Sequence, residues 1–303
     1  MIQNLIYLYC LTNKVPKLKP LDKSSGFYPE RSRGIKEIEA LVNNIYFIHS
    51  PATETNGGLS IPPKEPRVLA RVGFIFHQGL YAVTGRVSAD EFSEENLRKN
   101  LGNLEWITAK ASIHEKVIEI VMQNSCVIPF KFGAIFNTEE NLKTMLKKHI
   151  KEFKDTLKRL EGKEEWGVKI YCDMGRLKEN LIQDAEELLN LDKEINSALP
   201  GKAFILKKKK EESANIIVNK KLNECGQESF ERLKQYSIQS RINKLLPGEV
   251  TERKDEMILN AVFLADKNKV KEFVGVVDVL KAQYSDKGID FDCTGPWPPY
   301  NFC

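Results

Sequence analysis

The sequence lacks several features that would assign it quickly to a class. No uninterrupted apolar run reaches the roughly 18 residues of a membrane span, so no transmembrane helix is expected. The first ten residues carry neither a basic segment nor a long apolar stretch, so they predict a strand rather than a signal peptide. The net charge of +4 in 303 residues argues against the clustered basic face of a nucleic-acid-binding domain.

Catalytic and metal-binding motifs are missing as well. No GxxxxGK[ST], GxGxxG or GxSxG pattern occurs, so neither a phosphate-cradling loop nor a nucleophile elbow is expected. The histidines show no HExxH spacing, which argues against a helical zinc site. No nucleophile, base and oxyanion donor occur together, so nothing in these motifs argues for catalysis or for a metal site.

Paired cysteines are also absent. The six cysteines lie far apart and form no CxxC motif: Cys10, Cys126, Cys172, Cys225, Cys293 and Cys303. Several fall in or beside apolar strands. We interpret them as reduced thiols of a cytosolic protein rather than as a disulfide framework.

What the chain does contain is ordinary globular composition, with 42% hydrophobic and 29% charged residues, and enough length for two domains. Its central stretch predicts a strand over 126–132, with Pro129 favouring an edge strand or a bulge. An amphipathic helix is predicted over 137–163, with Asn137 as its N-cap. Trp166, Val168 and Ile170 then alternate along a strand over 165–173.

Strands and helices are predicted on both sides of this centre. The strands expected before it cover 2–10, 45–49, 68–77 and 80–87, and the helices cover 34–43, 88–101 and 104–124. Those expected after it are strands over 236–246, 256–265 and 289–293, and helices over 175–199, 202–235 and 267–284. A hairpin turn is predicted at Gln78-Gly79. Both regions read in βαββαβ-like order, which is typical of a ferredoxin-like α+β sandwich.

The predicted fold class is therefore α+β, with two ferredoxin-like sandwiches that have antiparallel sheets and are joined through a long central helix. The expected segments are an N-terminal domain over 1–136 with a Pro-rich insert over 50–67, the central helix over 137–163, and a C-terminal modified ferredoxin-like domain over 164–303. The last of these ends in a Pro-rich tail over 295–303.

Three polar features allow two interpretations each. His114 lies on an apolar helix face, where a hydrogen-bonded core histidine competes with a general base. Asp290 and Asp292 share one face of a strand, as a metal-binding pair or as a polar strand edge. The run Lys207–Lys210 is either a solvated helix face or an anion site.

Seven stretches together resemble a known family. They are GLYAVTGRV (79–87), WITAKASIH (106–114), VIPFKFGAIF (127–136), EEWGVKIY (164–171), PGKAF (200–204), ILNAVFLAD (258–266) and TGPWPPYNF (294–302). In this pattern the chain resembles the gas vesicle protein F/L family along nearly its whole length. The central block, the WITAKASIH run and the terminal TGPWPPY are its most specific parts. The Pro-rich insert before Arg67 is longer than the family pattern requires, and Cys303 falls outside it.

The resemblance implies a role as an accessory or minor structural protein in gas vesicle assembly, in the cytoplasm and the gas vesicle. It implies two α+β domains, the second a modified ferredoxin-like one. The implied partners are the small hydrophobic shell protein (GvpA-type) and other gas vesicle accessory proteins, with no nucleic acid and no membrane. The family is not known for catalysis and needs no cofactor.

A shell protein with apolar, strand-forming surface aggregates unless it is covered, so an accessory protein would hold it soluble through an exposed aromatic patch or a free sheet edge. The candidate contact residues are Tyr7, Tyr9, Phe130, Phe132, Trp297, Pro298, Pro299, Tyr300 and Phe302. The alternative is that the tail folds back and packs, with both phenylalanines in the core.

Two other function classes remain open at this point. A ferredoxin-like scaffold hosts many enzymes, and His114 with nearby carboxylates is the only catalytic candidate. A nucleic-acid binder is the other class, with bases stacking on Tyr7, Tyr9 and Tyr171, although the near-neutral charge weighs against it.

Overall fold

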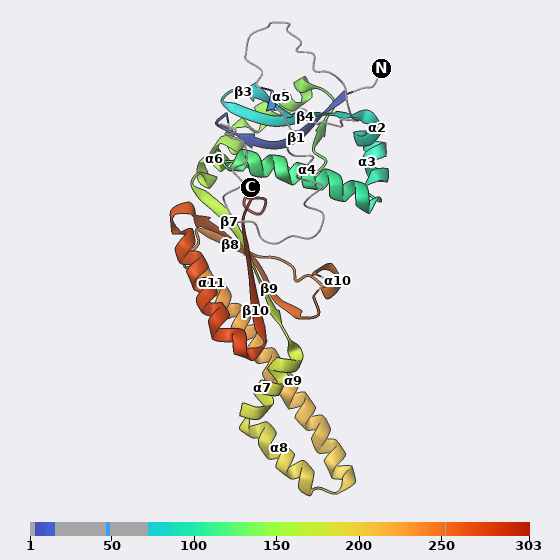
Figure 1. The fold of residues 1–303 in the computed structure, drawn as a ribbon, viewed down its shortest axis with the longest axis vertical. Coiled ribbons are helices and arrows are strands. Elements are labelled where there is room, and N and C mark those ends of the chain that lie inside the picture. Colours follow the sequence, from blue (N-terminus) through green and yellow to red (C-terminus); the bar gives the residue numbers. More distant parts are fainter. Residues whose placement is uncertain (1–3, 16–46, 49–71, 252) are drawn as a thin grey trace, which may run out of the picture. The chain divides into compact units, whose positions relative to one another are not determined.

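The structure is a computed structural model, and it describes residues 4–15, 47–48, 72–251 and 253–303 (Figure 1). The chain forms two compact units. Unit one comprises Met1–Glu161 and Pro298–Cys303, and unit two comprises Gly162–Trp297. The predicted helix over 34–43 and the Pro-rich insert over 50–67 lie outside the described residues. Whether the segments 1–136, 137–163 and 164–303 act as separate domains stays a prediction.

Unit one is built on a sheet with the strand order β2-β3-β4-β1-β5. Strand β6 also pairs with β1, at Ile6 and Tyr7, whereas β5 pairs with β1 at Cys10 and Leu11. The strands are β1 (Asn4–Thr12), β2 (Phe47–Ile48), β3 (Val72–His77), β4 (Leu80–Ser88), β5 (Ile128–Pro129) and β6 (Ile135–Phe136). All pairs are antiparallel except β2 with β3, which is parallel. The central strand β1 is buried from Leu5 to Thr12, as its continuous apolar sequence requires.

The hairpin between β3 and β4 confirms the turn predicted at Gln78-Gly79. Both residues have positive φ, 48° and 87°, and a two-residue hairpin turn with two positive φ values matches the twist of its strands. The register pairs His77 with Leu80 across the turn.

The helices of unit one are α2 (Ala89–Phe92), α3 (Glu94–Asn100), α4 (Leu104–Met122), α5 (Glu139–Lys148) and α6 (Ile150–Leu160). Helix α4 (Figure 1) is one of these helices. It buries His114, Val117, Ile118 and Val121, and these side chains lie in one core with Tyr7 and Tyr9 of β1. The predicted acidic helix over 88–101 is two helices, because Ser93 ends α2 and caps α3 by accepting from Asn96 N–H.

Two predictions at the centre of the chain are wrong in detail. The strand over 126–132 pairs only at Ile128 and Pro129, because proline cannot donate to the ladder. The long helix over 137–163 is two helices that meet at His149, where ψ is 16°, and its N-cap is Thr138 rather than Asn137. No proline or glycine lies at the break, so the apolar stripe continues through it and conceals it.

Unit two has a fully antiparallel sheet with the order β10-β7-β9-β8. Its strands are β7 (Lys163–Cys172), β8 (Gln239–Ile242), β9 (Glu256–Asp266) and β10 (Ile289–Trp297). In chain order these four strands follow a βαββαβ pattern. The fourth strand, β10, lies beside the first, β7, and the third, β9, lies beside the second, β8, which is the ferredoxin-like arrangement. Strands β5-β1-β4-β3 of unit one follow the same order, so the predicted α+β class with antiparallel sheets is confirmed.

The helices of unit two are α7 (Met174–Asp184), α8 (Glu186–Ser197), α9 (Pro200–Lys234), α10 (Gly248–Thr251) and α11 (Val270–Tyr284), with short 3-10 turns η1 (Lys267–Lys269) and η2 (Ser285–Lys287). The predicted helix over 175–199 is divided at Ala185, whose φ and ψ of −87° and 104° are extended. The apolar core includes Phe263 of β9 and Phe273 of α11. No helix in the described part of the chain is long and apolar enough to cross a membrane.

Candidate functional site

Residues from four separate parts of the sequence meet in a buried polar group of unit one, which we call the His114 cluster. It consists of Tyr7 on β1, His114 on α4, Phe130 and Gly133 in the segment after β5, and Tyr300 in the terminal tail. Three of the most specific sequence stretches, WITAKASIH, VIPFKFG and TGPWPPY, therefore contribute to one site.

The cluster exists because β5 is so short. Beyond Pro129 the backbone leaves the ladder after one more bond, from Phe130 N–H to the Tyr9 carbonyl at 2.9 Å. The next buried groups are satisfied by side chains instead. The Phe130 carbonyl lies 3.0 Å from His114 Nε2, and Gly133 N–H donates to the Tyr7 hydroxyl oxygen over 3.1 Å. Buried backbone groups require such partners, so these contacts stabilise the irregular segment.

The partners determine which ring nitrogen of His114 carries hydrogen. A carbonyl only accepts, so the Phe130 contact requires hydrogen on Nε2. The other nitrogen, Nδ1, then accepts from the Tyr7 hydroxyl at 2.9 Å, and that hydroxyl oxygen is free to accept from Gly133 N–H. One neutral tautomer therefore satisfies both ring nitrogens, and the Tyr300 hydroxyl oxygen, 3.0 Å from Nε2, is a second acceptor for the Nε2 hydrogen.

The environment holds His114 neutral at pH 7. Burial lowers the pKa of His114 to about 4, and the Phe130 carbonyl opposes the shift only partly. The rings of Tyr7, Tyr9 and Phe132 lie 5.6, 5.8 and 5.9 Å from the imidazole, centroid to centroid. With both nitrogens engaged by phenols and a carbonyl, the ring is a hydrogen-bonded core histidine. This arrangement favours the structural interpretation over a general base.

The tail after unit two is anchored in unit one by three kinds of contact. The Tyr300 hydroxyl lies 3.0 Å from His114 Nε2, and Arg159 Nη2 donates to the Phe302 carbonyl over 2.6 Å. The Phe302 side chain is buried. Within the tail, Tyr300 N–H donates to the Pro298 carbonyl at 2.7 Å, which closes a tight turn.

The nine predicted contact residues differ in accessibility. Those with buried side chains are Tyr7, Tyr9, Pro298, Pro299 and Phe302, and those half-buried are Phe130, Phe132 and Trp297. Tyr300 is exposed, with 38% of its surface accessible. The cluster thus includes one predicted contact residue that is exposed although its hydroxyl is bound. The contact role of the nine residues stays a prediction.

The remaining polar candidates have partners of their own. Asp290 accepts from Arg253 at 2.8 Å and lies 3.4 Å from Lys281 Nζ, and these cations hold its pKa below the usual range despite partial burial. It is a paired strand edge rather than half of a metal site. Among the described residues no group of three or more His, Cys, Asp or Glu side chains is arranged to hold a metal. In the lysine run, Lys210 pairs with Asp192.

Tyr171, the third candidate for base stacking, is buried like Tyr7 and Tyr9, and the Arg253 guanidinium lies 4.1 Å from its ring centroid. None of the three rings named for base stacking is therefore exposed to a nucleic acid.

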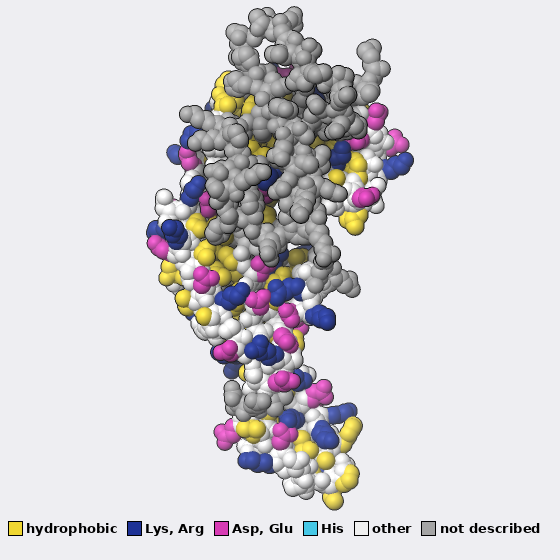
Figure 2. All heavy atoms as spheres, in the orientation of Figure 1, with side chains coloured by type: hydrophobic (Ala, Val, Ile, Leu, Met, Phe, Trp, Pro, Cys, Tyr) yellow, Lys and Arg dark blue, Asp and Glu magenta, His cyan; other side chains and the backbone are white. Residues whose placement is uncertain are grey.

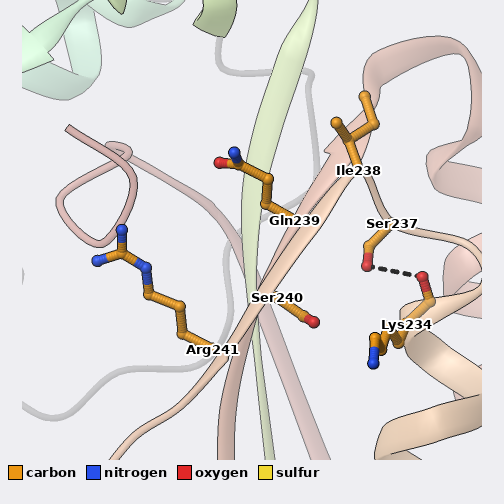
Figure 3. Close-up of a pocket in the computed structure, with 6 residues that line it drawn as sticks. All are labelled: Lys234, Ser237, Ile238, Gln239, Ser240 and Arg241. Atoms are coloured by element: carbon orange, nitrogen blue, oxygen red, sulfur yellow. Dashed lines mark hydrogen bonds between the residues drawn. The ribbon is translucent and has the colours of Figure 1, made fainter.

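A surface pocket of about 360 Å³ lies beside β8 in unit two (Figure 3). It is lined by Lys234, Ser237, Ile238, Gln239, Ser240 and Arg241. Ser237 Oγ donates to the Lys234 carbonyl at 3.1 Å, and Gln239 and Arg241 project to the side of the strand opposite Ser240. The lining contains neither a carboxylate nor a histidine, so it presents no nucleophile with an adjacent base.

Sequence reasoning identified His114, Phe130 and Tyr300 but did not predict that they meet. It missed Arg159, which lies in the last turn of α6 and holds the tail backbone. The one available signal was that the stretches carrying His114, Phe130 and Tyr300 were the most specific ones in the chain.

Comparison with known proteins gives consistent results. The model of the family described as gas vesicle synthesis protein GvpL/GvpF matches residues 5–303. Gas vesicle protein L of Streptomyces sp. (strain CB03234) is 26% identical over 81% of this chain and 86% of its own length. Gas vesicle protein F of the same strain is 25% identical over 84% of this chain and 94% of its own length.

The fold is shared with a solved structure. The crystal structure of gas vesicle protein GvpF from Anabaena sp. PCC7120 superposes with a TM-score of 0.61 at 18% identity, covering 99% of this chain and 98% of that one. Since the family model spans nearly every residue from the first strand to the terminal tail, the chain belongs to the gas vesicle synthesis protein GvpL/GvpF family.

Proposed function

We propose that this protein acts in gas vesicle assembly by binding the small hydrophobic shell protein and keeping it soluble until it joins the growing shell, in the cytoplasm and at the gas vesicle. The observation that carries the proposal is the family match over residues 5–303. Relatives that are aligned over most of this chain are named gas vesicle proteins L and F, which supports the same process. The family is not a known enzyme family, so the proposed activity is binding rather than catalysis.

The proposed contact is the exposed face of Tyr300 together with the adjacent Phe130 segment. Both belong to the His114 cluster, because His114 Nε2 lies 3.0 Å from the Phe130 carbonyl and from the Tyr300 hydroxyl. A ring held by its hydroxyl loses little conformational freedom when a partner covers it, and rigid aromatic side chains are common anchors in interfaces. The buried candidates would act indirectly, by holding this surface in place.

The test is co-expression of the full chain with a gas vesicle shell protein, followed by pull-down and sedimentation of the shell protein. We expect the shell protein to co-purify and to stay in the supernatant. Tyr300→Ala should abolish this effect, whereas the matched control Tyr300→Phe, which keeps the ring, should retain it.

Thermal unfolding of each variant separates contact from packing. Loss of binding by a Tyr300→Ala protein that melts within a few degrees of wild type supports the contact. If the wild-type chain neither binds the shell protein nor changes its sedimentation, the proposal is wrong.

A further inference from the structure

The first half of α9 pairs with α8 to form a helical hairpin that extends beyond the sheet of unit two (Figure 1). The hairpin has an apolar core of its own, formed by Leu188, Leu191, Leu206, Ala214 and Ile217. Lys210 Nζ also donates to Asp192 Oδ1 across the hairpin, over 2.6 Å. The inner face of this half of α9 therefore packs against α8.

The outer face of the same helix has no such cover. Ile205, Lys209, Glu212 and Ile216 follow one another at steps of four, three and four residues, so they lie along one side of the helix. The isoleucines are 67% and 68% exposed, and both charged side chains are exposed as well. Figure 2 shows hydrophobic side chains among charged ones on the visible surface of the hairpin. Within the described part of the chain, Lys209 and Glu212 take part in no ion pair.

The order of these four residues is self-complementary. Read from either end, the face presents an isoleucine, a charged residue, a second charged residue of opposite sign and an isoleucine. An identical helix laid antiparallel, with its two-fold axis between positions 210 and 211, puts each isoleucine opposite an isoleucine and each lysine opposite a glutamate. A parallel helix in register would instead put lysine against lysine.

We propose that this face of α9 binds a second copy of the chain, in an antiparallel and isologous contact. Ile205 packs against Ile216 of the partner subunit, and Lys209 pairs with Glu212 of the partner subunit. The two-fold axis repeats both contacts, as it does in any symmetric dimer. The apolar pairs at the two ends supply attraction, and the charge pairs in the middle fix direction and register.

The same face fits a lipid surface less well. A helix that lies in a membrane interface needs a continuous apolar stripe along its length. In α9 that stripe is the inner one, which α8 covers, and the outer isoleucines are separated by charged residues. A partner that offers both apolar groups and charges of each sign is therefore required, and a second copy supplies it.

The size of the face limits the strength of the contact. Ile205 and Ile216 are about 16 Å apart at 1.5 Å per residue, and the contact is smaller than the roughly 800 Å² per partner of a stable interface. We expect a weak dimer that forms at tens to hundreds of micromolar protein and dissociates as salt screens the charge pairs. This contact does not depend on shell-protein binding.

The test is sedimentation velocity of the full chain over a concentration series. Lys209→Glu and Glu212→Lys should each weaken dimerisation at least tenfold, because like charges then face each other. An equimolar mixture of the two variants should form a heterodimer, since both facing pairs become attractive again. Lys207→Glu is the matched control: it makes the same charge change on the same helix but off this face, and dimerisation should persist.

A second measurement uses disulfide trapping in a Cys303→Ser background. The double variant Ile205→Cys/Ile216→Cys should give a cross-linked dimer, whereas each single variant should not, because residue 205 lies far from residue 205 of the partner subunit. Circular dichroism checks that all variants keep their helices.

The proposal is overturned if the wild type stays monomeric throughout, if both charge variants dimerise like the wild type, or if their mixture remains monomeric. It is also overturned if the wild type binds phosphatidylglycerol vesicles through this face without self-association.

Discussion

The two units share one strand order but complete it in different ways. The fourth strand of the βαββαβ pattern, which pairs with the first strand, differs in length. It is β10 in unit two, with nine residues, and β5 in unit one, with two residues. In unit two, β10 pairs with β7 through its backbone, and an apolar core that includes Phe263 packs against the sheet. In unit one, the side chains of Tyr7 and His114 satisfy the backbone that a full strand would have paired.

A strand can therefore be replaced by a small set of side-chain hydrogen bonds, but the stability of the segment then depends on few residues. A ladder spreads its stability over many equivalent bonds, whereas a buried polar cluster becomes unstable when a single member changes its charge. Unit two should therefore be most sensitive to lost volume, and unit one to lost or protonated hydrogen-bonding groups.

The largest effect is expected from Phe263→Ala in unit two. Phe263 is fully buried, with the rings of Phe230 and Phe273 at 5.7 and 5.3 Å, so truncation leaves a cavity and should cost about 3–5 kcal/mol. Hydrogen exchange read by mass spectrometry should show the loss of protection mainly in residues 162–297. Val279→Ala on the exposed face of α11 is the control and should change stability by less than about 0.5 kcal/mol.

Acid should destabilise unit one next most strongly. The pKa of His114 is about 4 when folded and about 6.5 in an unfolded chain, so the stabilisation is complete above pH 6.5 and is lost as the pH falls towards 4. The full loss is roughly 3 kcal/mol, since each pKa unit corresponds to about 1.4 kcal/mol.

Urea unfolding at pH 7.5, 6 and 5, followed by exchange in unit one, measures this acid effect. His114→Gln should flatten the pH dependence. Equal stability of unit one at pH 7.5 and 5 would contradict the assigned neutral, buried imidazole.

An intermediate effect is expected from Gly295→Ala in β10. Gly295 has a φ of +153°, and an added Cβ would lie 2.9 Å from Trp166 Cδ2 and 3.0 Å from the Glu165 carbonyl oxygen. The crowding should destabilise unit two by about 1–3 kcal/mol, measured by urea denaturation. Gly201→Ala, where an added Cβ meets nothing within 4 Å in the first turn of α9, should be neutral or slightly stabilising.

The smallest effect is expected from Tyr300→Phe in unit one. It removes only the hydroxyl that bonds His114 Nε2, and that nitrogen keeps its bond to the Phe130 carbonyl. We expect a loss of about 0.5–1.5 kcal/mol in urea unfolding, with increased exchange confined to the tail and its neighbours. A loss as large as that of Phe263→Ala would mean that the two units do not differ in the way described.

Local patterns predicted much of this fold. The stretch EMILNAVFLAD is apolar on both sides and is the buried central strand β9, and Gln78-Gly79 forms the predicted turn. Helix breaks were not predicted, because His149 and Ala185 interrupt helices without proline or glycine. No local sequence signal marks either break, and the apolar stripe of the first helix continues through His149.

The candidate site was less accessible to sequence reasoning. The helical position of His114 on an apolar face predicted its burial, which the structure confirms. Its partners lie 107 and 186 residues away in the sequence, and no local pattern carries that information. The aromatic side chains of β1 look the same from the sequence whether they face solvent or core, and here they face the core.

The division of unit one between the two ends of the chain has a consequence for biosynthesis. The chain leaves unit one after Glu161 and returns to it at Pro298, so the ribosome makes all of unit two before the segment that binds His114 exists. At about 5–20 residues per second, unit one waits on the order of ten seconds in an unfinished form. Tyr300 therefore reaches its place beside His114 only after unit two has been translated.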